Sequence, residues 1–232
     1  HLMSLVGGEK YDLVIFNGDC FDDPEKEADI VDILAEYCKA YGSDRIPSVF
    51  MRGNHEIRGA CSVVLWDYLS KAGEHSYTAF TMGGTRFVLL DCGEDKPDAT
   101  DVYYGMNDFT QYRKEQAQFL QAELADAEFI KASRKILIHH IPIYGNAVAK
   151  FNPCKELWQP HLATAGFDVS LNGHLHRYEL IEKGASENNF PVVIGGGYKE
   201  ENATLMILKK EGSRLNLRVI HAKGNTLLNR DL

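Results

Sequence analysis

Four short apolar segments, each followed at once by a polar loop, constrain the fold of this chain more than any other feature. The segments are DLVIFN (12–17), PSVFM (47–51), KILIH (135–139) and FDVSL (167–171). Short apolar runs bounded by turn residues are typical of strands buried on both faces. Apolar residues at helical spacing over 25–41 predict a helix between the first two strands. The order of these segments therefore predicts an α/β fold.

The rest of the chain continues this order and then becomes richer in strands. Gly83 and Gly84 predict the turn of a hairpin, and Asn107 or Asp108 is a candidate cap for a long helix. The other predicted elements are helices at 61–71 and 156–165, and strands at 75–82, 85–91, 178–181, 191–194, 204–208 and 215–221. We find no repeat, low-complexity tract or linker, so we expect residues 1–232 to form a single domain.

Composition and charge narrow the range of partners. The 232 residues are 44% hydrophobic and 25% charged, which is ordinary globular usage and enough to bury a core without disulfides. The formal net charge is −8, and an acidic surface repels a polyanion, which argues against nucleic acid as the main partner. A small phosphorylated substrate is compatible with this charge, because bound metal ions reverse the local field.

The cysteine pattern and the first residues of the chain are the sequence features that relate to the cellular compartment. The five cysteines are odd in number and form no Cys-x-x-Cys pair, so they indicate neither a full disulfide set nor a thiolate zinc site. A single disulfide involving Cys61 or Cys92 stays open.

No apolar run approaches the ~20 residues of a membrane span. The opening His1-Leu2-Met3 resembles a vector remnant, so we expect the natural N-terminus to be missing. Compartment, including export of the full-length parent, and oligomeric state stay open.

The polar loops after the four apolar segments carry metal-binding residue types. They are GDCFDD (18–23), GNHE (53–56), HHIP (139–142) and GHLH (173–176), and they hold five of the nine histidines. The crevice beyond the carboxyl ends of strands is the usual ligand site in open α/β sheets. Carboxylate, amide oxygen and imidazole without thiolate favour Mn, Fe, Zn or Ni. Two such ions, roughly 3.5–4 Å apart, could bind a bridging hydroxide and clamp a phosphate for in-line attack.

Each loop taken alone also has a structural interpretation. Gly-Asp and Gly-Asn-His are common turn sequences, and one histidine of a His-His pair can be a satisfied core residue. Gly-His-x-His is the strongest single signal, because alternate side chains of an extended segment share one face. The ordered occurrence of all four at predicted strand ends favours a common site.

This ordered set resembles the motifs of the calcineurin-like metallophosphoesterase superfamily. The matching motifs are GDCFD (18–22), GNHE (53–56), HIP (140–142) and GHLH (173–176), while IHHIPIY (138–144) and NGHLHRYEL (172–180) resemble the purple acid phosphatase branch. The resemblance implies a four-layer α-β-β-α sandwich. It also implies a phosphoesterase that hydrolyses phosphate monoesters or diesters by attack of a metal-bridging hydroxide.

The resemblance also assigns roles to individual residues. Asp19 would bridge both metals, and Asn54, His140 and His174 would complete the second metal site. His176 would belong to the first metal site. His140 is preferred to its neighbour because family members show the ligand as His-x-Pro, and because strand alternation prevents adjacent histidines from facing the same way.

Two further residues complete the implied site. His55 would contact the phosphate and help to protonate the leaving group, and Asp22 would support the site from behind the ligands. Purple acid phosphatases carry a metal-binding Tyr three residues after the bridging Asp, where this chain has Asp22. We therefore expect no purple chromophore, and a metal pair like that of the wider family.

The larger departure from the family is that no Asp-x-His precedes Asp19. In the family this motif ends the first central strand and supplies two ligands to the first metal. Residues 4–10 are instead similar to the end of the helix that follows that strand, so we expect the sequence to start one strand late. The full-length protein would then hold two ions. This chain would retain one of them, in an intact second site, and would have low activity.

Two alternative functions stay open from the sequence. A cyclic-nucleotide or nucleic-acid phosphodiesterase would use the same metals and would differ in its pocket walls, for which residues 93–106 and 143–155 are candidates. A non-catalytic metal-binding domain is favoured only if the missing strand is natural.

Overall fold

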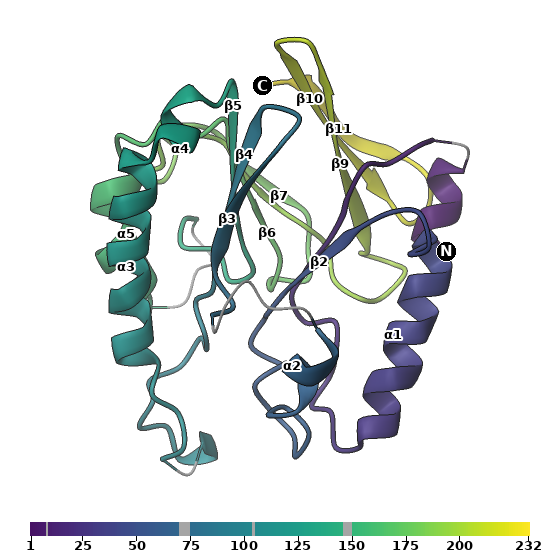
Figure 1. The fold of residues 1–232 in the computed structure, drawn as a ribbon, viewed down its shortest axis with the longest axis vertical. Helices are drawn as coiled ribbons and strands as arrows, with labels where there is room; N and C mark the ends of the chain where they lie inside the picture. The colour runs from purple at the N-terminus through teal and green to yellow at the C-terminus, as the bar shows by residue number, and fades with distance from the viewer. Residues whose placement is uncertain (8, 70–74, 104, 146–149) are drawn as a thin grey trace.

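The computed structural model describes residues 1–232 except 8, 70–74, 104 and 146–149 (Figure 1). Its largest sheet has the strand order β3-β4-β5-β6-β8-β7. Four of these strands run parallel to their neighbours, and β3 and β7 pair antiparallel at the two edges. The strands are β3 (Thr78–Met82), β4 (Thr85–Leu90), β5 (Arg134–His139), β6 (Val169–Asn172), β7 (Glu179–Ile181) and β8 (Val192–Ile194).

Two smaller sheets pack against one face of this sheet. Strands β1 (Val14–Asn17) and β2 (Ser48–Met51) form a parallel pair, while β9 (Thr204–Glu211), β10 (Arg214–His221) and β11 (Thr226–Asp231) form an antiparallel sheet. Alternate residues of β5, Ile136 and Ile138, join Leu217 and Val219 of β10 in the core between the layers. Among the described residues, no strand links β1 to the three-stranded sheet.

Helices cover the two outer sides of the sheets. Helices α3 (Phe109–Ala125), α4 (Ala127–Lys131) and α5 (Pro153–Leu162) lie on the large sheet, where Leu120 and Trp158 pack with Val88 and Leu137. Helices α1 (Glu27–Tyr41) and α2 (Leu65–Tyr68) lie on the opposite side of the molecule and pack beside β1 and β2 (Figure 1). This arrangement confirms the predicted four-layer α-β-β-α class.

Several predicted elements differ from the structure in length. The helix predicted at 61–71 is helical only over Leu65–Tyr68; turns precede it, and Leu69 turns to extended backbone, while positions 70 and 71 lie outside the described residues. Residues 2–6 form one short 3-10 helix, and the described residues of the helix end predicted at 4–10 contain no α-helix. Helix α4 and strand β11 have no counterpart in the prediction.

Two local predictions are settled by contacts. Asp108 stands at the N-cap position of α3, but its side chain accepts no capping bond. The carboxylate of Asp98 instead accepts the backbone N–H of Thr110 at 3.0 Å. All five cysteines are free thiols, so the structure contains no disulfide at Cys61 or Cys92. No helix among the described residues has the length and apolar character needed to cross a membrane.

Candidate metal centre

The carboxyl ends of four parallel strands bring the predicted ligands together. Asp19 and Asn54 follow β1 and β2, and His140 and His174 follow β5 and β6. Nε2 of His140 lies 2.9 Å from Oδ2 of Asp19, and Nδ1 of His174 lies 2.9 Å from Oδ1 of Asn54. The two imidazole centroids are 5.5 Å apart. Residues that are more than 100 positions apart in the sequence therefore converge from two sheets.

Tight backbone bends allow this approach. Gly18 has a φ of +76°, and a Cβ there would lie 2.6 Å from the ring of His140. A Cβ on Gly53 would lie 2.3 Å from Oδ1 of Asp19. Asp19 and His174 themselves have φ values of 52° and 68°, and non-glycine residues adopt such values at a cost that is most often found at functional sites.

The ring of His140 is buried and held from one side. Its Nδ1 lies 2.6 Å from the backbone carbonyl of Asn17 and donates its proton there, because a carbonyl can only accept. In the described part of the chain, Nε2 is a buried nitrogen without a hydrogen bond, although it points at the Asp19 carboxylate. A buried nitrogen of this kind needs either a proton shared with Asp19 or a cation beside it.

The charges of this pair stabilise each other in the metal-free chain. Burial alone would raise the pKa of Asp19, but the adjacent His140 and the backbone N–H of His55 lower it to about 2. Burial alone would lower the pKa of His140, yet the close contact of its ring with the Asp19 carboxylate raises it. A cation bound between Asp19 and His140 would displace the proton that lies between these two side chains.

His139 occupies a different environment from its neighbour. It lies in the core beside Trp158, with ring centroids 6.0 Å apart, and its Nδ1 lies 2.8 Å from the carbonyl of Ile141. Burial lowers the pKa of His139 to about 4. The adjacent side chains of His139 and His140 therefore lie in different environments, as strand alternation predicts.

Glu56 organises the backbone around the cluster, a role that the sequence does not indicate. Its carboxylate is buried and accepts the backbone N–H groups of Asp19 (2.9 Å), Cys20 (2.5 Å), Phe21 (3.2 Å) and Gly53 (2.7 Å). The bonds from Asp19, Cys20 and Phe21 connect the loop after β1 to the loop after β2. The only sequence signal is that Glu56 is the last residue of the GNHE motif, and this position does not predict its four hydrogen-bond partners.

His55 lies beside the cluster rather than within it. Its backbone N–H donates to Asp19 at 3.0 Å, and its ring Nδ1 lies 2.8 Å from Oδ1 of Asp22 and 3.5 Å from Asp23. The Asp22 side chain is 89% exposed and contacts His55, so any support that it gives acts through that ring. The ring Nε2 lies 3.4 Å from the guanidinium of Arg58.

The structure does not bring His176 into the cluster. The ligand atoms of Asp19, His140 and His174 all lie within 4.8 Å of one another, whereas His176 is exposed and its ring packs against Tyr198 at 5.6 Å. The extended conformation predicted for 173–176 is wrong. Positive φ values at His174 and His176 turn the loop, and therefore the two side chains do not share a face.

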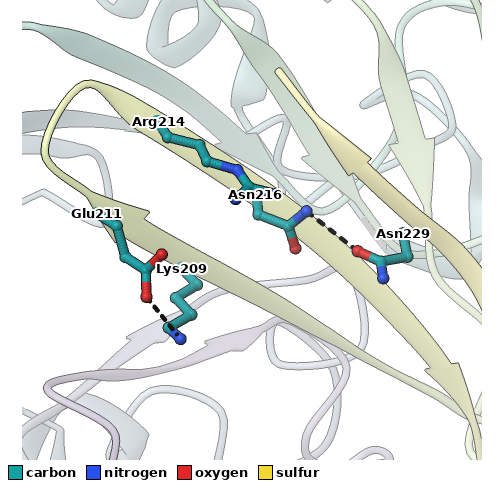
Figure 2. Close-up of a pocket in the computed structure, with 5 residues that line it drawn as sticks. All are labelled: Lys209, Glu211, Arg214, Asn216 and Asn229. Carbon is teal, nitrogen blue, oxygen red and sulfur yellow. Dashed lines mark hydrogen bonds and ion pairs between the residues drawn. The ribbon is translucent and has the colours of Figure 1, made fainter.

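A separate surface hollow lies on the C-terminal sheet and shares no residue with this centre. It has a volume of about 240 Å³ and is lined by five polar side chains (Figure 2), namely Lys209, Glu211, Arg214, Asn216 and Asn229. The Lys209 ammonium pairs with Glu211 at 2.8 Å, and Asn216 donates to Asn229 at 3.0 Å. Arg214 pairs with Asp231 at 2.8 Å. These groups are therefore engaged in pairs, and the hollow presents no chemistry comparable with that of the metal centre.

Comparison with known proteins gives matches in sequence and structure. Serine/threonine-protein phosphatase CPPED1 of Pongo abelii is 25% identical over 158 residues, covering 64% of this chain and 46% of that protein. Purple acid phosphatase 15 of Arabidopsis thaliana is 25% identical over 233 residues, covering 87% and 41%. The chain thus spans less than half the length of these relatives.

Solved structures share the fold at lower identity. Purple acid phosphatase PPD1 from yellow lupin superposes with a TM-score of 0.73 at 17% identity, covering 99% of this chain and 48% of that one. A dimetal phosphatase from Danio rerio gives 0.66 at 13% identity, covering 95% and 83%. The model of the calcineurin-like phosphoesterase family matches residues 1–178. The chain therefore belongs to the calcineurin-like phosphoesterase family, and within it resembles purple acid phosphatases.

Proposed function

We propose that this chain holds one cation between Asp19, Asn54, His140 and His174, and that its full-length parent hydrolyses phosphate esters. The observation that carries the proposal is the pair of 2.9 Å separations between prospective ligand atoms of these residues. Donor atoms bound at about 2.1 Å to one ion and at right angles to each other lie roughly 3 Å apart. The two pairs therefore have the spacing of neighbouring ligands.

The chemistry of the donors fits a borderline or hard cation. One carboxylate, one amide oxygen and two imidazoles suit Mn, Fe, Zn or Ni, and the buried Nε2 of His140, which has no hydrogen bond among the described residues, gains a partner when an ion binds. Such a cation, when bound, polarises phosphoryl oxygens and makes a nucleophile available from water at neutral pH.

The side chains around the cation have separate tasks in this proposal. Asp22 orients the His55 ring through Nδ1, and the opposite nitrogen faces Arg58. His55 would contact the phosphate there and help to protonate the leaving group. The backbone N–H of His55 also holds one oxygen of Asp19, which keeps the other oxygen directed at His140. His176 would serve a second ion in the full-length protein.

Metal binding by the chain itself is the first test. Isothermal titration of the metal-free protein with Mn²⁺ should give one site per chain, and Asp19→Asn should abolish it. Asp44→Asn removes an exposed aspartate that is paired with Arg45 and should bind Mn²⁺ like the wild type. Absence of Mn²⁺ binding by the wild type would overturn the proposal, and two tightly bound ions per chain would contradict the single intact site.

Activity is the second test. The full-length protein should hydrolyse p-nitrophenyl phosphate or bis(p-nitrophenyl) phosphate in the presence of Mn²⁺, and Asp19→Asn should remove that activity. The ratio of the two rates distinguishes a monoesterase from a diesterase. Mn²⁺ binding without hydrolysis of either ester would instead support a non-catalytic metal-binding domain.

A further inference from the structure

We propose that Asp95 is a positioning residue that fixes the orientation and tautomer of His174, so that Nδ1 of this ring faces the cation. This inference rests on the proposed function. Oδ2 of Asp95 lies 3.5 Å from Nε2 of His174, on the side of the ring opposite Nδ1, which is 2.9 Å from Asn54. The separation is long for a hydrogen bond, but it places a carboxylate opposite the nitrogen that does not face the cluster.

The Asp95 carboxylate is held in place by its own contacts. Its Oδ1 accepts the ammonium of Lys96 at 2.5 Å, and its backbone N–H donates to Glu94 at 2.8 Å. Glu94 is fully buried and is paired with Arg58 at 2.9 Å. The loop after β4 therefore presents the remaining oxygen of Asp95 to His174 from a fixed position. Asp95 is also outside the group of residues whose ligand atoms lie within 4.8 Å of one another.

A neutral imidazole carries one proton, so its two nitrogens cannot both donate. In the metal-free chain Nδ1 donates its proton to Oδ1 of Asn54, because an amide oxygen can only accept. When a cation takes the place of that proton, the ring carries its single proton on Nε2, which faces Asp95. A carboxylate behind a histidine ligand fixes the ring and raises its basicity as a ligand. His140 has the equivalent arrangement with opposite nitrogens, because Nδ1 contacts the Asn17 carbonyl and Nε2 points at Asp19. Each ring thus has an oxygen acceptor on the side remote from the cation.

The direct test is the Nε2–H group of His174 in the chain loaded with diamagnetic Zn²⁺. ¹H–¹⁵N NMR spectra should show this proton protected from exchange with water in the wild type and exchanging rapidly in Asp95→Ala. Mn²⁺ affinity, measured by titration calorimetry, should fall about 10- to 100-fold in Asp95→Ala. Asp95→Asn retains an oxygen that can accept from Nε2, so it should keep this proton protected and bind Mn²⁺ with intermediate affinity.

The outcomes separate this inference from the proposed function. Wild-type affinity together with a protected Nε2–H in Asp95→Ala would overturn the role of Asp95 and leave the metal site intact. Failure of the wild type to bind Mn²⁺ would overturn the metal site itself. A loss of more than about 100-fold in Asp95→Asn with the Nε2–H protection unchanged would identify Asp95 as a ligand instead. If Asp95→Ala does not fold, the near-isosteric Asp95→Asn supplies the comparison, and wild-type affinity in it would contradict the inference.

Discussion

Replacing Glu56 by glutamine tests what holds the two ligand-bearing loops together. One oxygen of this buried carboxylate accepts the N–H groups of Cys20 and Phe21, and the other accepts those of Asp19 and Gly53. Glutamine has nearly the same shape, but one oxygen becomes an NH₂ group that can only donate. Whichever position the NH₂ group takes, two buried backbone donors face a third donor.

The expected loss follows from these partners. Each buried N–H left without an acceptor costs about 1–3 kcal/mol, so two of them give about 2–6 kcal/mol. An opposing effect reduces this loss, because burial and the nearby charge of Asp19 raise the pKa of Glu56, and removing a buried charge relieves that cost. We therefore expect Glu56→Gln to lower the free energy of unfolding by about 2–3 kcal/mol. Glu56→Ala, which removes the acceptor for all four groups, should cost about 3–5 kcal/mol.

Urea unfolding of the metal-free proteins, followed by far-UV circular dichroism, measures this loss. Glu36→Gln changes an exposed glutamate of α1 and should stay within about 0.5 kcal/mol of the wild type. Mn²⁺ affinity should fall in Glu56→Gln as well, because the loops that carry two of the ligands lose their common anchor. A midpoint and an affinity equal to those of the wild type would refute the idea that this carboxylate organises the site.

Three further predictions concern the same region. Gly18→Ala should destabilise the chain by more than 2 kcal/mol in the same urea assay, because φ is +76° and the new Cβ would meet the ring of His140 at 2.6 Å. The control Gly212→Ala, where φ is +60° and the surroundings are open, should lose only about 1 kcal/mol of stability. Loading the protein with ferric iron should produce no tyrosinate absorption band in the visible spectrum, because Asp22 stands at the tyrosine position; a strong band would contradict this. Burial lowers the pKa of His139 to about 4 in the folded chain, so the neutral ring contributes fully to folding stability above pH ~6.5. This contribution, up to about 3 kcal/mol, is lost as the pH falls toward 4. Stability curves of the wild type and His139→Gln that stay parallel from pH 7 to 4 would disprove this.

The strand ends could be predicted because two independent signals coincide there. Buried strands need apolar runs, and a glycine at the end of a run permits the bend that turns a ligand into the crevice. Both signals are present at Gly18 and Gly53, and the structure places Asp19 and Asn54 directly after them. Helix α1 could likewise be predicted from the spacing of its apolar residues, whereas α2 could not be delimited because its flanking turns have similar composition.

Other parts of the site depend on contacts that no local pattern contains. Three of the four bonds of Glu56 join segments that are more than 30 residues apart. Asp95 lies in a loop without a recognisable motif, and its position follows from the buried Glu94 and from Lys96. The loop that contains His176 was predicted as extended from an alternation rule that holds only for regular strands. Positive φ values, which the sequence does not reveal at non-glycine residues, break this rule.

The position of the ligands gives the cation a structural role as well as a chemical one. Asp19 and Asn54 belong to the small β1-β2 sheet, and His140 and His174 belong to the large sheet. An ion bound by all four would join two layers that also meet through apolar packing and through the hydrogen bond from His140 to the Asn17 carbonyl. Binding to the folded chain alone adds about 2.7 kcal/mol of stability at a free-ion concentration 100 times the Kd. Among the described strands, β1 and β2 pair only with each other, so no strand ladder holds this pair to the large sheet. We therefore expect the ion to protect the β1-β2 pair from local opening more than it protects the large sheet.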